Sequence, residues 1–85
     1  MFVGDEEKVR IQFDNSLLGV VIDRFGKDSV TYKIDDNSFM AILTVKLSPP
    51  FWGWIFQFGN RVKIVSPENV RDMFVKHIDE VMEVY

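Results

Sequence analysis

The order of apolar and polar residues along the chain predicts four β-strands. Residues 8–13 alternate strictly between polar and apolar side chains, and residues 30–34 repeat this alternation. Strict alternation is typical of a strand with one buried face, because successive side chains of a strand point to opposite sides. The pattern returns in residues 39–47 and, over a shorter stretch, in residues 61–65, which are the third and fourth predicted strands.

The third predicted strand is apolar on both faces near its start. Its expected inner face consists of Phe39, Ala41, Leu43, Val45 and Leu47. Met40 and Ile42 make the opposite face apolar as well. We therefore expect this strand either to be covered locally on both sides or to be exposed where a partner docks.

Two helices are predicted between these strands from apolar spacing and end signals. Residues 14–16 supply N-cap side chains for a helix over residues 15–25, and Gly26 suits the left-handed position that ends it. Ser48 can cap a second helix, which Gly59 terminates. The core stripe expected on the second helix consists of Trp52, Ile55 and Phe56, widened by Phe51, Trp54 and Phe58.

A third helix is predicted from residue 67 onward. Ser66 is expected to cap it, and Pro67 is tolerated in the first turn because its missing N–H would have no partner there. Its apolar stripe, at helical spacing, consists of Val70, Met73, Phe74, His77, Ile78, Val81, Met82 and Tyr85. Such a stripe must be buried, either on the open face of the sheet or against a second polypeptide or the rest of a longer chain.

The predicted order of elements is β-α-β-β-α-β-α. A β-α-β-β-α-β run indicates the ferredoxin-like arrangement, a four-stranded antiparallel sheet with two helices on one face. The fold class expected is therefore α+β, ferredoxin-like, with an extra C-terminal helix. At 85 residues the chain is one domain, which we place at residues 8–85, and residues 1–7 are expected to be a linker from a preceding domain.

Composition narrows the class of protein. The net charge of −3 and the pI near 5.0 leave no overall basic footprint of the kind that nucleic-acid-binding domains carry. Cysteine is absent from the sequence, which excludes disulfides and thiolate metal sites and fits a reducing compartment. No apolar run approaches the ~18 residues needed to span a membrane. We therefore expect a cytoplasmic protein with no membrane contact.

Catalytic chemistry has little support in the sequence. His77 is the only histidine and lies within the apolar stripe of the third helix, where a packed side chain is a better interpretation than a metal ligand. Asp35-Asp36-Asn37 resembles the start of a calcium loop but lacks its glycine and closing glutamate, so a turn is favoured. We predict no enzymatic activity, no metal and no cofactor.

Basic residues of two strands are candidates for ligand contact. Arg10 lies on the polar side of the first strand, and Arg61 and Lys63 lie on the fourth, which is its neighbour in the expected sheet. The stripe is either a solvated face or a contact for a nucleotide or nucleic-acid effector.

Aromatic and apolar residues of the last two helices are candidates for a partner interface. Trp52 and Trp54 are two residues apart and cannot share one helical face, so one belongs to the core and the other lies at its edge or is exposed. An exposed Trp beside Phe51 would be an association hot spot. With the end of the third helix included, the candidate interface residues are Trp52, Phe51, Met82 and Tyr85.

Residues 54–67 carry a family resemblance. The run WIFQFGNRVKIVSP is similar to the W-x-x-x-F-G-x-x-V-x-I-x-x-P signature of the WCX domain, the C-terminal extension of WYL-domain transcriptional regulators. Residues 9–14, residues 21–26 and the terminal stripe ending in Tyr85 are also similar, so the likeness covers residues 8–85. The signature residues Trp54, Phe58, Gly59, Val62, Ile64 and Pro67 read as fold determinants rather than catalytic groups.

The resemblance implies a role in transcription regulation. Regulators of this kind are bacterial and usually dimeric, with an N-terminal winged helix-turn-helix domain that binds DNA and a WYL domain that senses a ligand. It implies a non-catalytic regulatory or oligomerisation domain that contacts the other domains of the regulator and forms a homodimer. It further implies a small-molecule or nucleotide effector, and DNA contact only through the N-terminal domain that these 85 residues do not contain. The chain therefore reads as a fragment of a longer regulator.

Overall fold

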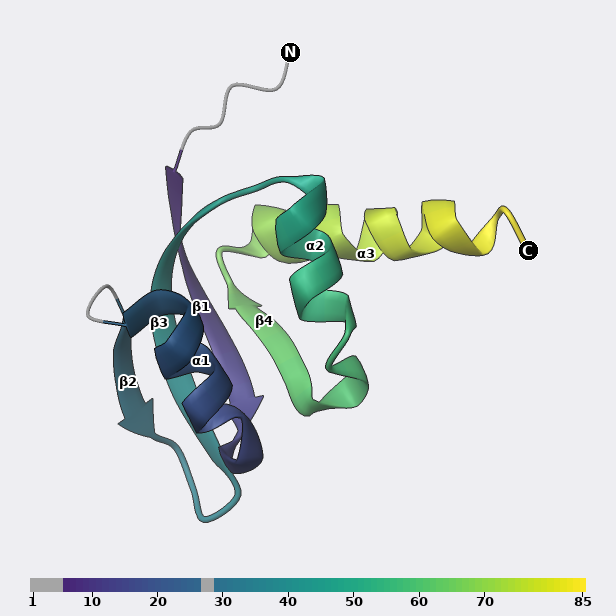
Figure 1. Ribbon diagram of the computed structural model, residues 1–85. Helices are drawn as coiled ribbons and strands as arrows, with labels where there is room; N and C mark the ends of the chain where they lie inside the picture. The colour runs from purple at the N-terminus through teal and green to yellow at the C-terminus, as the bar shows by residue number, and fades with distance from the viewer. Residues whose placement is uncertain (1–5, 27–28) are drawn as a thin grey trace.

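The computed structural model describes residues 6–26 and 29–85, which form one sheet and the helices packed around it (Figure 1). The strands are β1 (Glu6–Asp14), β2 (Val30–Lys33), β3 (Ser38–Lys46) and β4 (Val62–Ser66). The α-helices are α1 (Leu18–Phe25), α2 (Pro49–Phe56) and α3 (Glu68–Met82). Short 3-10 turns, η1 (Asn15–Leu17) and η3 (Gly59–Arg61), precede α1 and β4.

The sheet has the strand order β2-β3-β1-β4, and every neighbouring pair is antiparallel. Because β3 lies between β1 and β2, and β1 lies between β3 and β4, each helical crossover skips one strand, as in the split β-α-β arrangement. The predicted α+β fold with an extra C-terminal helix is confirmed, and the strand order is compatible with a ferredoxin-like fold.

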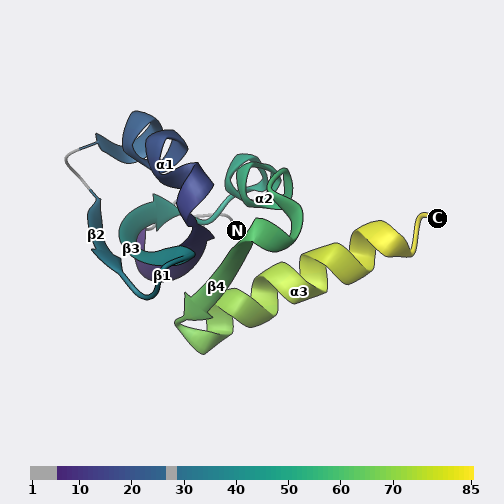
Figure 2. The ribbon, with the colours of Figure 1, turned by 90° about the horizontal axis from the view of Figure 1, so that it is seen from below.

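The core lies between the sheet and the helices α1 and α2, which cover the same face (Figure 2). Val9, Ile11 and Phe13 of β1 are fully buried on that face, as their alternation predicts. The β1–β3 register sets Val9 opposite Leu43 and Phe13 opposite Phe39. The two phenylalanine rings stack with their centroids 5.5 Å apart, so the register joins the two strands through their side chains as well as their backbones.

The predicted start signals hold for the first two helices, and the predicted end signal holds for the first. Asp14 caps the turn that leads into α1, because its carboxylate accepts the backbone N–H of Ser16 at 2.9 Å. Gly26 closes α1 with a positive φ of 55°. Ser48 caps α2 by accepting the N–H of Phe51 at 3.4 Å. Gly59 also has a positive φ, 60°, but it begins η3 rather than directly ending α2.

Phe56 was predicted to belong to the core stripe of the second helix, and this is wrong. Its side chain is 56% exposed. The buried face of α2 is centred on Phe51 and Ile55, which are one turn apart, and Trp52 marks its edge. Phe56 follows beyond that edge, where the described chain provides no cover. Phe58, after the helix, is buried instead.

The predicted capping of the third helix by Ser66 is also wrong. Ser66 is the last residue of β4, where it pairs with Arg10 of β1. Pro67 occupies the N-cap position, and no side chain caps the helix there. The carbonyl of Pro67 accepts the N–H groups of Val70 and Arg71 instead, which closes the first turn through the backbone alone.

Helix α3 is anchored between Val70 and His77, and its last turn is not. Val70 is fully buried, and the ring of Phe74 lies 5.6 Å from that of Trp52 in α2. Beyond His77, whose ring stacks on Trp52 at 6.5 Å, the helix projects past β4 and away from the sheet (Figures 1 and 2). Of the two alternatives for its apolar stripe, burial on the chain's own open sheet face is therefore excluded.

The expected linker, residues 1–7, falls mostly outside the described residues, since the description begins at Glu6. Strand β1 starts there, two residues before the predicted strand. The assignment of the preceding residues to a linker stays a prediction.

Candidate functional site

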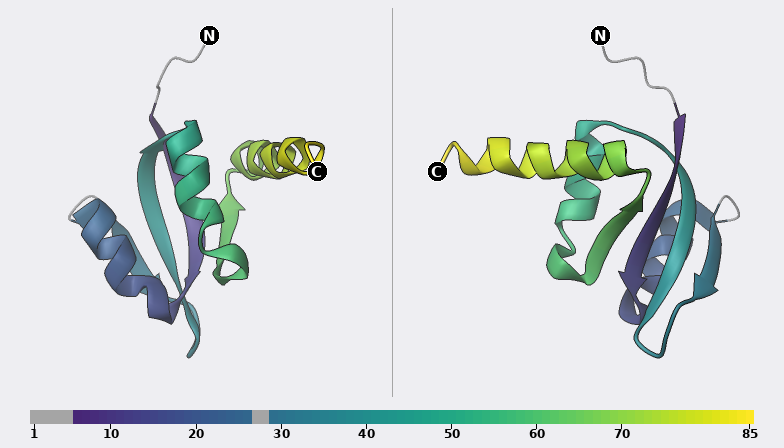
Figure 3. Two further views of the ribbon diagram at one scale, coloured as in Figure 1. Left: turned by 45° about the vertical axis from the view of Figure 1, so that its right-hand side comes forward. Right: turned by 180° about the vertical axis from the view of Figure 1, so that it is seen from behind.

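The face of the sheet opposite α1 and α2 carries no helix among the described residues, and it lies open in the rear view (Figure 3, right). Strand pairing sets out two rows of side chains across this face. The first row runs Tyr32, Met40, Gln12 and Lys63. The second row runs Val30, Ile42, Arg10 and Ser66. The open face is therefore apolar over β2 and β3 and basic or polar over β1 and β4.

The apolar half of the open face joins residues from two strands. Val30 is 59% exposed and Tyr32 is also exposed, while Met40 and Ile42 are half-buried. The sequence indicated an apolar outer face for Met40 and Ile42 but did not connect it with Val30 and Tyr32. That connection depends on the β2–β3 register, which no periodicity within one strand contains.

The structure brings together two of the three candidate basic residues. Arg10 and Lys63 lie on the open face in adjacent rows, on neighbouring strands. Lys8 continues the basic side of β1, opposite Thr44 of β3. The register shift between Arg10 and Ile11 spaces the β4 residues unevenly along β1, but leaves both cations on the same side of the sheet.

Arg61 lies apart from the other two. It belongs to the η3 turn rather than to β4, and its Nη1 donates to the hydroxyl of Ser16 at 3.5 Å. Asp14 is close enough for the Arg61 charge to affect its carboxylate. Arg61 therefore faces the η1 turn at the end of the sheet, and it does not extend the basic stripe of Arg10 and Lys63.

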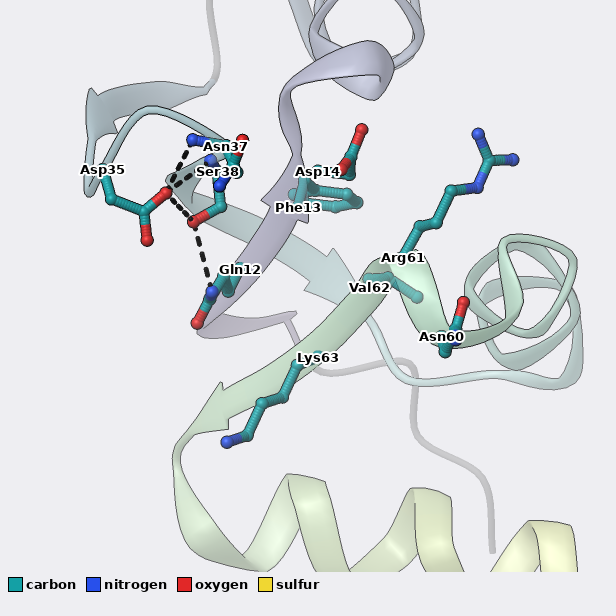
Figure 4. A pocket seen from close by; sticks show the side chains of 10 residues that line it. All are labelled: Gln12, Phe13, Asp14, Asp35, Asn37, Ser38, Asn60, Arg61, Val62 and Lys63. Atoms are coloured by element: carbon teal, nitrogen blue, oxygen red, sulfur yellow. Dashed lines mark hydrogen bonds between the residues drawn. The ribbon is translucent and has the colours of Figure 1, made fainter.

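A shallow hollow of about 480 Å³ lies between Arg61 and Lys63 (Figure 4). The two cationic side chains point away from each other across it. The other lining residues are Gln12, Phe13, Asp14, Asp35, Asn37, Ser38, Asn60 and Val62. The two acidic side chains of the hollow, Asp14 and Asp35, accept hydrogen bonds from residues of their own turns. The hollow therefore has no group of converging catalytic side chains.

The two acids of the hollow are held as carboxylates by local hydrogen bonds. The hydroxyl and the N–H of Ser16, with a smaller effect of Arg61, hold the pKa of Asp14 below its ordinary value of 3.8. The N–H of Asn37 and the hydroxyl of Ser38 hold the pKa of Asp35 below the same value. Gln12 donates to that Ser38 hydroxyl at 3.2 Å, which connects the β2–β3 turn to β1. These carboxylates therefore organise turns, as predicted for the Asp35 segment.

Neither a metal-binding cluster nor a membrane-spanning helix is found in the part of the chain that the structure describes. No group of three histidine, cysteine or acidic side chains there could hold a metal ion. No helix there is long and apolar enough to cross a membrane.

The candidate interface residues fall into two groups. Phe51 and Trp52 are 6% and 8% exposed, and both contribute to the core. Trp54 is half-buried against Phe13, Phe25 and Phe58, so neither tryptophan is the exposed side chain that would be a hot spot beside Phe51. By contrast, Met82 is 66% exposed and Tyr85 is fully exposed. Whether a partner uses any of these residues stays a prediction.

The end of α3 is the second exposed apolar surface. We call the segment Val75–Tyr85 the α3 arm. Its exposed apolar side chains are Val75, Val81, Met82, Val84 and Tyr85. Val75 and Val84 were not part of the predicted stripe; Val75 lies at its edge, and Val84 follows the last residue of the helix. Their exposure widens the apolar surface of the arm.

The family assignment follows from a comparison with protein-family models. The model of the WCX domain matches residues 5–82. The chain belongs to the WCX domain family. The resemblance carried by residues 54–67 is thereby confirmed, and its Trp54, Phe58 and Ile64 are now seen as part of the core or packed against it.

Membership of the WCX family associates this chain with WYL-type transcriptional regulators. The WCX domain is a regulator-associated domain and not a known catalytic family. A search of curated proteins found no matching relative.

Proposed function

We propose that this WCX domain is a non-catalytic regulatory and oligomerisation domain of a WYL-type transcriptional regulator. In this proposal DNA binding belongs to a helix-turn-helix domain outside the 85 residues, and the WCX domain joins subunits of a cytoplasmic homodimer. It also contacts the other domains of the regulator and passes on the effector signal.

The observation that supports the proposal is the α3 arm. A projecting helix with Val75, Val81 and Met82 exposed leaves apolar surface in water, and burial stabilises such surface by about 25 cal/mol per Å². The buried Val70 and the contact of Phe74 with Trp52 set the direction of the arm, so association can cover it without unfolding the domain.

Sedimentation equilibrium over a range of chain concentrations tests this proposal. We expect the wild-type chain to form a dimer, and a Val81→Asp, Met82→Asp variant to stay monomeric. The matched control, Val20→Asp, Ile22→Asp on the exposed side of α1, makes the same change of charge away from α3 and is expected to dimerise like the wild type. A wild-type chain that is monomeric at all concentrations would contradict the proposal.

The alternative role, an effector site for a nucleotide or nucleic acid, has less support. It required Arg10, Arg61 and Lys63 to act together, and Arg61 lies with Ser16 at the end of the sheet instead.

A further inference from the structure

We infer that the open face of the sheet receives the α3 arm of a second copy of the chain. The inference rests on the proposed function and adds the surface that the arm meets. It is based on two exposed apolar surfaces of one chain, their arrangement in the fold, and the opposite charges beside them.

The two surfaces are separated within one chain. The arm continues from the part of α3 that is fixed by Val70 and Phe74, and it leaves the domain beyond the β4 edge (Figure 2). The apolar half of the open face lies over β2 and β3, at the other side of the sheet. In a dimer, the arm of each copy can pack on the open face of the other copy. Two copies related by a two-fold axis therefore bury both arms and both open faces.

The charges beside the two surfaces are opposite. The open face carries Lys8, Arg10 and Lys63, and at the start of β1 the cross-strand partners Glu6 and Lys46, so its net charge is positive. The arm carries Asp79, Glu80 and Glu83 against a single cation, Lys76. In the described part of the chain none of these charges belongs to an ion pair. Complementary charge of this kind favours encounter and sets the orientation of docking.

The layout of the arm matches that of the sheet. At 3.6 residues per turn, Val75 and Met82 lie on one line along the helix, two turns apart. Asp79 and Glu83, one turn apart, lie within about a quarter turn to one side of that line, and Lys76 borders them. The arm is thus an apolar strip beside an acidic one. The open face is an apolar strip, Val30 and Ile42 with their neighbours, beside a basic one.

Charge reversal on each surface tests the pairing. The first variant is Arg10→Glu, Lys63→Glu, which makes both surfaces acidic. The second is Asp79→Lys, Glu83→Lys, which makes both basic. Each variant alone is expected to raise the dimer dissociation constant by about tenfold, because attraction becomes repulsion at both contacts.

Mixing the two variants gives the decisive result. In a mixed dimer each acidic sheet face meets a basic arm and each basic face meets an acidic arm, so we expect the mixture to form a heterodimer with nearly the wild-type dissociation constant. Circular dichroism confirms that both variants are folded. The control variant, Arg24→Glu, Lys33→Glu, makes the same change of charge away from the open face and is expected to dimerise like the wild type.

Other outcomes would overturn the inference. If the wild type dimerises but the charge variants dimerise equally well, or their mixture gains nothing, the arm meets another surface, and the proposed function stands without this one. If the wild type is monomeric, both fail. If the wild type binds a single-stranded oligonucleotide and Arg10→Glu, Lys63→Glu abolishes that binding, the face belongs to nucleic acid instead.

Discussion

Phe13 of β1 makes aromatic contacts both within the sheet and with helix α2. It is fully buried, stacks on Phe39 at 5.5 Å and meets Trp54 edge-on at 6.0 Å. The ring of Trp54 also contacts the rings of Phe25 and Phe58, with centroid distances of 5.4 and 5.0 Å. Phe13 thus reaches α2 directly through Trp54, and Trp54 in turn reaches Phe25 of α1.

Replacing Phe13 with Ala is expected to destabilise the domain by about 3–5 kcal/mol, from lost burial and the cavity left behind. A domain of this size has little stability in reserve, so we expect the variant to be largely unfolded. The comparison is Phe56→Ala, an aromatic 56% exposed on α2, expected to change the free energy of unfolding by about 0.5 kcal/mol at most. Urea denaturation measures both, and equal losses would contradict the assignment of the core.

Asp35 gives the stability of the domain a dependence on acid pH. Its folded pKa is lowered by the N–H of Asn37 and the hydroxyl of Ser38, so the carboxylate stabilises the fold above the unfolded value near 3.8. That contribution is lost as the pH falls below that value and through the folded pKa. We expect Asp35→Asn to flatten the fall in urea midpoint between about pH 5 and pH 2. An unchanged slope would show that the turn does not hold the carboxylate in solution.

At the scale of elements, α3 differs from α1 and α2 because only half of it is packed. Its contacts to the domain are concentrated in Val70, Phe74 and His77, and the helix begins without a side-chain cap. The stability of α3 therefore depends on docking against Trp52 more than on local signals in its sequence.

Truncating Phe74 to Ala is expected to release α3 while leaving the sheet in place. We expect a loss of about 2 kcal/mol, since the side chain is half-buried, and faster amide hydrogen exchange along α3. The amides of β1 and β3 should keep most of their protection. Uniform loss of protection across all elements would mean that α3 and the sheet unfold as one unit.

The sequence predicted the elements well where the cause is local. Alternation in residues 8–13 and 39–47 marked the strands and their buried faces, and Ser48 and Gly26 marked helix ends. Two of the errors have tertiary causes. Ser66 pairs with Arg10 and so continues β4, and Phe56 faces solvent because the packing of α2 is centred elsewhere.

The candidate surfaces were predictable only in part for the same reason. The charges of Arg10 and Lys63 could be placed on one face from the expected strand order. The 3-10 turn that takes Arg61 away from them has no clear signal in the sequence. Joining Val30 and Tyr32 to Met40 and Ile42 needed the pairing of strands distant along the chain.

At the scale of the whole molecule, the domain has one closed face and one open face, with a helix projecting beside them (Figure 3). The closed face is fully covered by α1 and α2. Its side chains on the two central strands are all buried: Val9, Ile11 and Phe13 of β1, and Phe39, Ala41, Leu43 and Val45 of β3. The open face and the α3 arm remain exposed. The association that we propose makes both of them interior surfaces of a dimer.

The most direct test is an isotope-filtered nuclear Overhauser measurement on a mixture of labelled and unlabelled chains, which detects only contacts between copies. We expect contacts from the methyl groups of Val75 and Met82 in one copy to Ile42 and the Tyr32 ring in the other. Intermolecular contacts confined to other surfaces, or none at concentrations where a dimer forms, would contradict the account.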